Sequence, residues 1–158
     1  QYAHEKQDMM QQRIEENELT LALLQDRENQ NLDEIDKKER LIAQLKQEKL
    51  ELRTWTFWQT PIYKKVMSLS EQKEVDKKAR KVMTDVEREK LKKTVFEIYA
   101  DYISPLQAQY SQLTEDDLLV LCLQEAGISP LAISLCFGHT DTVALNQRKS
   151  RLKKKMSE

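Results

Sequence analysis

The segment LTEDDLLVLCLQEAGISPLAISLCFGHTDTVALNQRKSRLKKKM, residues 113–156, contains three short runs with helical patterning, separated by glycine-containing turns. The boundaries coincide with capping and terminating residues: Thr114 with Asp117, Gly127, Ser129 with Pro130, Gly138, and Thr140. We therefore predict three consecutive short helices joined by tight turns. The apolar residues Leu145, Leu152 and Met156 mark the inner face of the third helix, with the stem of Arg148 between them.

Charge is divided unevenly along this segment. Residues 113–139 carry a net charge of -4, and residues 140–158 carry +4, although the 158-residue chain as a whole has a net charge of -1. A scaffold helix, a bracing helix and a basic third helix are the layout of a helix-turn-helix unit, in which the third helix enters the major groove of DNA. The acidic start keeps the first helix away from phosphate, so one end of the unit would face a polyanion.

The N-terminal part of the chain has the pattern of a coiled coil. Residues 5–53 contain no Gly or Pro, and apolar residues recur at spacings that are sums of three and four. The predicted seam consists of Met10, Ile14, Leu21, Leu24, Ile35, Ile42, Leu45 and Leu52. An uninterrupted helix there would be about 75 Å long. We expect a homodimer paired through this seam; the alternative is a helix folded against another part of the same chain.

Between these regions lie shorter elements. Trp55, Phe57, Trp58 and Tyr63 cluster around Pro61, where we expect the long helix to meet the following ones. Residues 69–82 are highly charged and predict a mobile helix or loop, and the pair Thr84 and Glu87 forms a capping box. The prediction is an all-α fold with a coiled-coil helix at 1–58, a helical connector at 59–112 and a helix-turn-helix domain at 113–158.

Several functions are disfavoured by composition. With two His, at positions 4 and 139, the chain has no metal-ligand spacing, no nucleophile–base pair and no glycine-rich phosphate loop, so we expect neither an enzyme nor a cofactor or metal. No small-molecule substrate is evident, and no apolar run is long enough to span a membrane. Cys122 and Cys136 lie in apolar runs and are predicted to be buried reduced thiols, which fits a cytoplasmic setting.

Residues 5–156 resemble the C-terminal cytoplasmic part of membrane-anchored, tetratricopeptide-type transcription regulators of Bacteroidetes, with a LuxR/GerE-like helix-turn-helix. The similarity lies in the TEDDL opening, the ISPLAIS second helix, the basic ending and the TFWQTPIY stretch. It implies a signal-transducing piece of a longer inner-membrane protein, placed in the cytoplasm. One departure is the turn FGHTDTVA, which lacks the usual Ser-x-x-Thr-Val spacing, so the resemblance does not fix where the basic helix begins.

These observations predict a dimeric regulator of transcription that binds double-stranded DNA. With Leu145 and Leu152 inward, the opposite face gives the candidate base-contacting residues Thr142, Val143, Asn146, Gln147 and Ser150. The candidate phosphate-contacting residues are Arg148, Lys149, Arg151, Lys153 and Lys154. The alternative is a coiled-coil interaction or scaffold protein whose basic helix binds an acidic partner or an anionic membrane surface.

Overall fold

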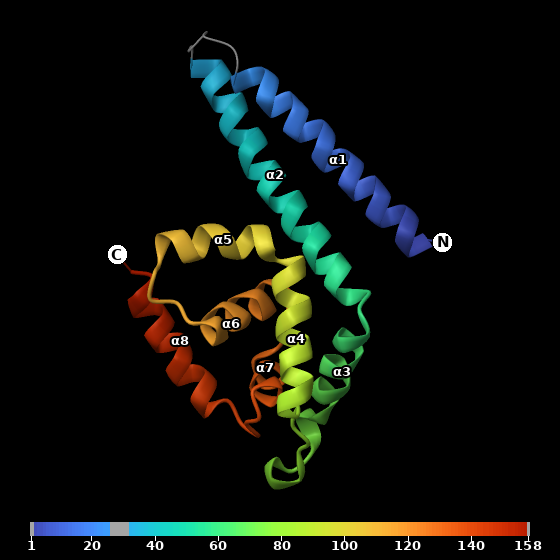
Figure 1. Ribbon diagram of the computed structural model, residues 1–158, viewed down its shortest axis with the longest axis vertical. Helices are drawn as coiled ribbons and strands as arrows, with labels where there is room; N and C mark the ends of the chain where they lie inside the picture. The colour runs from blue at the N-terminus through green and yellow to red at the C-terminus, as the bar shows by residue number, and fades with distance from the viewer. Residues whose placement is uncertain (1, 26–31, 158) are drawn as a thin grey trace. The chain divides into compact units, whose positions relative to one another are not determined.

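The computed structural model describes residues 2–25 and 32–157, and every regular element in these ranges is helical (Figure 1). The predicted all-α class is therefore confirmed. The chain forms two compact units, Gln1–Thr56 and Phe57–Glu158. The α-helices are α1 (Tyr2–Gln25), α2 (Leu32–Trp58), α3 (Pro61–Ser70), α4 (Asp85–Ile98), α5 (Ala100–Gln109), α6 (Glu115–Glu125), α7 (Pro130–Cys136) and α8 (Val143–Lys155). Two 3-10 turns, η1 (Glu71–Glu74) and η2 (Lys77–Ala79), lie between α3 and α4.

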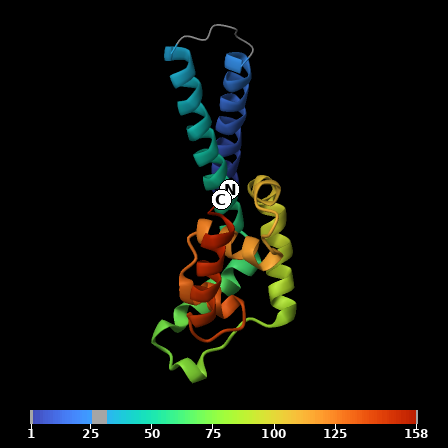
Figure 2. The ribbon, with the colours of Figure 1, turned by 90° about the vertical axis from the view of Figure 1, so that its left-hand side faces the viewer.

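The first unit is a pair of helices that run antiparallel, as both ribbon views show (Figures 1 and 2). Near the open end, the Gln7 amide donates a hydrogen bond to the Thr56 hydroxyl, and the Lys6 ammonium lies 4.4 Å from the centre of the Trp55 ring. Farther along, the Lys49 ammonium lies 3.2 Å from the Glu18 carboxylate. Contacts between residues far apart in sequence therefore fix the register of α1 against α2.

Polar groups also lie on the interface between these two helices. The Glu48 side chain is 11% exposed, accepts a hydrogen bond from the Asn17 amide, and has Arg13 Nε 3.2 Å from its second oxygen. A buried carboxylate must be paired to avoid a desolvation penalty, so this contact favours one alignment of the pair over shifted ones.

The hairpin corrects one expectation from the sequence. The described helices are not an uninterrupted rod over residues 5–53; they correspond to the alternative in which one helix packs on another of the same chain. Met10, Ile14 and Leu45 are buried, Leu21, Leu24, Ile42 and Leu52 are half-buried, and Ile35 is 37% exposed. A stripe with heptad spacing is buried only against a partner helix, which can belong to the same chain or to a second one. In the structure α2 is the partner of α1.

In the second unit, Thr60 lies between the end of α2 at Trp58 and α3, of which it is the N-cap residue. Thr60 has an extended backbone, its hydroxyl accepts a hydrogen bond from the Tyr63 N–H, and Pro61 is the first helical residue. Phe57 is fully buried with its ring 5.3 Å from that of Tyr63, and Trp58 Nε1 donates to the Ala126 carbonyl. In this unit the aromatic residues pack helices together, as expected.

Helix α7 lies at the centre of the second unit and contacts α3, α6 and α8. Residues 132–136 of α7 are all buried, as expected for a helix surrounded by other helices. Helix α6 contributes a further buried group that includes Leu118, Leu119 and Leu123, and α4 contributes Leu91 and Val95. The predicted capping boxes at Thr84 and Thr114 are both confirmed, as is the Ser129 cap of α7.

The turns on either side of α7 each contain a glycine in the left-handed conformation, Gly127 at φ +79° and Gly138 at φ +84°. A Cβ at Gly127 would meet open space, whereas a Cβ at Gly138 would lie 3.2 Å from Arg88 Nη2. Only Gly138 therefore combines backbone strain with a close contact.

We expect Gly127→Ala to lower the free energy of unfolding by about 1 kcal/mol, the cost of a left-handed backbone for a residue with a side chain. Gly138→Ala should cost more, because Arg88 must also move from the turn that it holds. Urea denaturation of both variants beside the wild type measures the difference. Equal losses, or a larger loss for Gly127→Ala, would contradict this account of the two turns.

Candidate nucleic-acid interface

The start of α8 is fixed by the turn before it, residues 137–142. Arg88 of α4 donates from Nε to the Cys136 carbonyl at 2.8 Å, at the end of α7. Asp141 accepts a hydrogen bond from the Val143 N–H at 3.1 Å, so its side chain caps the first turn of α8. The helix begins at Val143 with Thr142 as the N-cap residue, three residues after Thr140, near which the start was expected.

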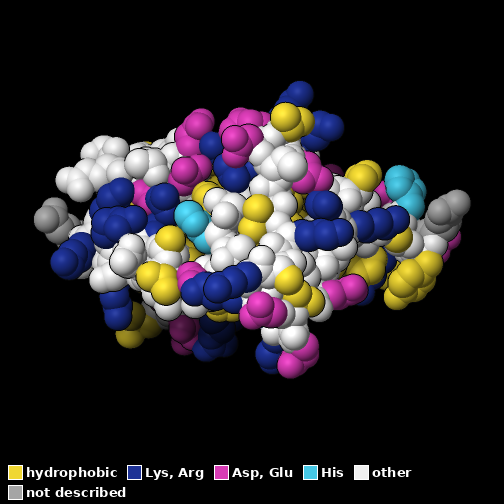
Figure 3. Space-filling model, turned by 90° about the horizontal axis from the view of Figure 1, so that it is seen from below, with side chains coloured by type: hydrophobic (Ala, Val, Ile, Leu, Met, Phe, Trp, Pro, Cys, Tyr) yellow, Lys and Arg dark blue, Asp and Glu magenta, His cyan; other side chains and the backbone are white. Residues whose placement is uncertain are grey.

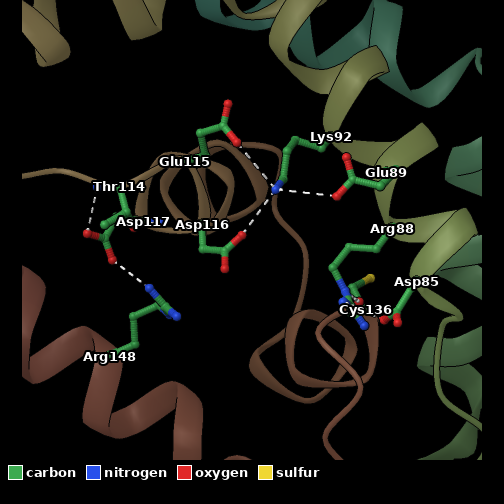
Figure 4. A network of polar contacts seen from close by, with 10 residues as sticks. All are labelled: Asp85, Arg88, Glu89, Lys92, Thr114, Glu115, Asp116, Asp117, Cys136 and Arg148. Atoms are coloured by element: carbon green, nitrogen blue, oxygen red, sulfur yellow. Dashed lines mark hydrogen bonds and ion pairs between the residues drawn. The ribbon is translucent and has the colours of Figure 1, made fainter.

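The inner face of α8 combines two leucines with two cations. Leu145 and Leu152 are buried, as predicted. Between and beyond them, Arg148 Nη1 and Lys155 Nζ each lie 2.7 Å from a different oxygen of Asp117 on α6. Figure 4 shows Arg148 reaching across from α8 to this carboxylate. The basic helix is thus held on the domain by charge as well as by apolar packing.

Asp117 itself is one of the most buried charged groups of the second unit, with a side chain that is 3% exposed. Burial raises the pKa of Asp117, but hydrogen bonds from Lys155, the Thr114 backbone N–H and Arg148 outweigh that effect and lower the pKa to about 2. The same carboxylate therefore completes the capping box of α6 and binds the two inward-facing cations of α8.

The other acidic residues at the start of α6 are paired from a different side. Lys92 Nζ of α4 lies 3.3 Å from Asp116, 3.7 Å from Glu115 and 3.7 Å from Glu89 (Figure 4). Burial lowers the pKa of Lys92, but its carboxylate partners, Asp116 first, produce a net rise. The negative charge that the sequence places before α8 is therefore largely neutralised by α4 and by α8 itself.

The outer face of α8 carries most of the predicted contact residues. Val143, Asn146, Gln147 and Ser150 are exposed, and Thr142 just before the helix is half-buried. Arg151, Lys153 and Lys154 are exposed and Lys149 is half-buried; none of these four forms an ion pair with a described residue. Three uncharged hydrogen-bonding side chains thus lie on a solvent-facing helix whose free cations lie mainly in its C-terminal half.

Arg148 differs from the other predicted phosphate contacts. Its side chain is 27% exposed, its guanidinium is bound to Asp117, and its Cζ lies 5.8 Å from the centre of the Phe137 ring. Its place in the stripe of Leu145 and Leu152 indicates this inward position. Lys155, ten residues after Leu145, shares the stripe, and the same spacing could have identified it as a second partner of Asp117.

Other chemistry is not evident in the described ranges. No cluster of three or more His, Cys, Asp or Glu side chains able to hold a metal ion occurs there. Cys122 and Cys136 are buried reduced thiols, as predicted, and burial raises the pKa of the Cys136 thiol to about 12. Among the helices described, none has both the length and the apolar character needed to cross a bilayer. No protein-family model, curated protein or solved structure matches the chain.

The Asp117 contacts predict a specific pH dependence. The pKa of Asp117 is about 2 in the folded state and 3.8 ordinarily, so the pairing contributes about 2 kcal/mol that is complete above pH 4 and is lost as the pH falls toward 2. We expect Asp117→Asn to lower the free energy of unfolding by about that amount at pH 7, and the deficit to narrow between pH 5 and pH 3. Urea denaturation across this range measures both.

Asp116→Asn is the matched control, because the Asp116 side chain is 43% exposed and Lys92 retains two other carboxylate partners. Its effect should remain below 1 kcal/mol, as for exposed ion pairs generally. A deficit for Asp117→Asn that did not change with pH would show that lost packing, rather than charge, explains its instability.

Proposed function

We propose that this chain is a non-enzymatic transcription regulator that binds double-stranded DNA with the outer face of α8. The observation that carries the proposal is the division of that helix into two faces. Leu145 and Leu152 are buried and Arg148 is bound to Asp117, while Asn146, Gln147 and Ser150 face solvent beside free cations. Amide side chains can pair bidentately with adenine, and lysines and arginines bind phosphate.

The arrangement of α6, α7 and α8 supports this reading. A seven-residue helix, a six-residue turn and a thirteen-residue helix follow one another, with the turn held by contacts from outside the three helices. In helix-turn-helix proteins the last helix must be rigid in order to place its side chains against base edges. The anchoring of α8 at both Leu145 and Leu152, with two ion pairs on one carboxylate, supplies that rigidity.

The second candidate is an interaction protein whose α8 binds an anionic membrane surface or an acidic partner. A helix that lies on a membrane needs a free apolar face. In α8 the two core-facing leucines are 4% and 5% exposed, so the face that a membrane would take up is already occupied, and only Val143 offers a large exposed apolar side chain. This observation favours DNA over a membrane as the partner.

Duplex DNA selected from a random pool with this protein provides the test. Wild-type affinity should fall steeply with salt, and Arg151→Gln/Lys153→Gln/Lys154→Gln should reduce the slope of log K against log salt by about 2 to 3. The triple variant Lys64→Gln/Lys90→Gln/Lys93→Gln, which makes the same charge change on α3 and α4, is the control. It should leave the slope nearly unchanged.

Asn146→Ala and Gln147→Ala should act differently from the charge variants. Each should lower discrimination between the selected site and a single-base variant of it by about 1 to 3 kcal/mol, with little change in the salt slope. Competition binding with matched duplexes measures this. If the protein binds heparin, polyglutamate and every duplex equally well, the DNA-reading proposal is wrong and the second candidate takes its place.

We also propose that two copies act together on DNA, in a cytoplasmic setting, because recognition helices usually work in pairs on two half-sites. Met10, Ile14 and Leu45 are at most 8% exposed within the hairpin, so pairing of chains through these side chains requires the α1–α2 hairpin to open. The heptad spacing is compatible with either state.

A cysteine cross-link distinguishes the two states of the seam. In a parallel dimer, Ile14→Cys places two thiols opposite each other, and mild oxidation on the DNA site should give a covalent dimer. In the hairpin, Ile14 is buried inside one chain and should not cross-link. Glu15→Cys, on the exposed side, is the control, and the native thiols are too buried to compete. If the Ile14→Cys variant saturates the DNA site and gives no disulfide-linked dimer, pairing of chains through the seam is wrong.

A further inference from the structure

The charged segment between α3 and α4 is ordered by its own side chains rather than by packing. The Gln72 amide group bridges to the backbone of Lys81, donating to its carbonyl at 2.8 Å and accepting from its N–H at 2.7 Å. Arg80 donates from Nε to the Gln72 carbonyl and from Nη2 to the Lys73 carbonyl. These bonds close residues 72–81 into a compact loop, and a loop is one of the two forms that the sequence predicts for this charged segment.

The same loop is joined to the turn that leads into α8. Arg80 Nη1 donates to the Thr140 carbonyl at 2.8 Å, and Lys77 Nζ lies 2.5 Å from the Asp141 carboxylate. Just after the loop, the N–H of the buried Met83 donates to the Leu135 carbonyl of α7 at 3.0 Å. Three separate contacts therefore fix residues 72–83 next to the N-terminal end of α8.

A shallow hollow lies between the charged loop, the first turn of α7 and the turn that leads into α8. It is lined by Ser70, Lys73, Arg80, Ser129, Pro130, Leu131, Asp141 and Thr142. These residues include the first turn of α7 and the residue just before α8. In helix-turn-helix complexes the first of the two helices crosses the DNA backbone and the N-terminal residues of the second contact base edges. A phosphate of the bound duplex would thus pass close to this hollow.

Cations of the loop divide into two groups. Lys77 and Arg80 are occupied by Asp141 and by backbone carbonyls. Lys73, Lys78 and Lys81 are exposed and form no ion pair with a described residue. Acidic side chains at 71, 74 and 76 are also exposed, so residues 71–81 carry five basic and three acidic groups. Figure 3 shows the face seen from below, on which Lys and Arg side chains lie in separate groups among Asp and Glu side chains.

Building on the proposed function, we infer that Lys73, Lys78 and Lys81 form a second phosphate-binding cluster at the N-terminal end of α8. Arg151, Lys153 and Lys154 form the first cluster, toward its C-terminal end. Thirteen helical residues span about 20 Å, more than the roughly 12 Å width of the major groove. A helix of this length can reach both phosphate backbones that border the groove, and in the proposed complex one cluster lies against each of them.

The test compares Lys73→Gln/Lys78→Gln/Lys81→Gln with wild type and with the control triple Lys64→Gln/Lys90→Gln/Lys93→Gln, which removes the same charge from α3 and α4. Binding to the selected duplex is measured from low to high salt. The loop variant should reduce the salt slope by about 2 to 3 and weaken binding about equally for the selected site and its single-base variants. Urea denaturation of each variant confirms that the fold is retained.

A second variant tests the placement of the loop rather than its charge. Arg80→Lys keeps the positive charge and the three lysines, but an ammonium cannot reproduce the guanidinium contacts to Thr140, Gln72 and Lys73, so the salt slope should still fall by about 1 or more. One outcome is that wild type binds DNA with a steep salt slope that the loop variant lowers no more than the control triple does. In that case the proposal of a second phosphate-binding cluster is wrong, and the proposal of DNA binding stands. If wild type itself shows no salt-dependent DNA binding, the proposed function fails.

Discussion

The carboxylate of Asp117 joins the first helix of the C-terminal trio to the last, and the orientation of α8 depends on it. It accepts bonds from the backbone at the start of α6 and from two cations on α8, while its side chain is almost inaccessible to water. A charge buried to this extent is tolerated only because all of its partners are present. The inner cations of α8 are thereby bound, and the outer cations are left facing solvent.

A second set of contacts determines where α8 begins. The turn after α7 is held by arginines from two different places in the chain, Arg88 on α4 and Arg80 at the end of the charged loop. Arg88 donates to the Cys136 carbonyl, which as the last of α7 lacks a partner within the helix, and Arg80 donates to the Thr140 carbonyl in the turn itself. The three C-terminal helices therefore do not form an independent helix-turn-helix unit, because residues 71–98 help to hold them. For this reason the charged loop is part of the proposed interface.

The N-terminal hairpin shows how one pattern allows two assemblies. The a/d stripe from Met10 to Leu52 requires a partner helix but does not specify whether that helix belongs to the same chain. In the structure α2 is that partner, with Glu48 paired to Asn17 and Arg13 inside the interface. The free-energy difference between a closed hairpin and a pair of chains would depend on protein concentration, which the spacing of leucines does not encode.

Local signals in the sequence were sufficient for the helices of the second unit. The capping boxes at Thr84 and Thr114, the Ser129–Pro130 start of α7 and the left-handed glycines act within a few residues of themselves, so their positions could be predicted without the fold. The same is true of the inward Leu145 and Leu152. What required the tertiary structure were contacts between distant residues: Asp117 with Lys155, Arg80 with Thr140, and α1 with α2. These depend on where the packed helices place each side chain, and no spacing along the chain specifies that placement.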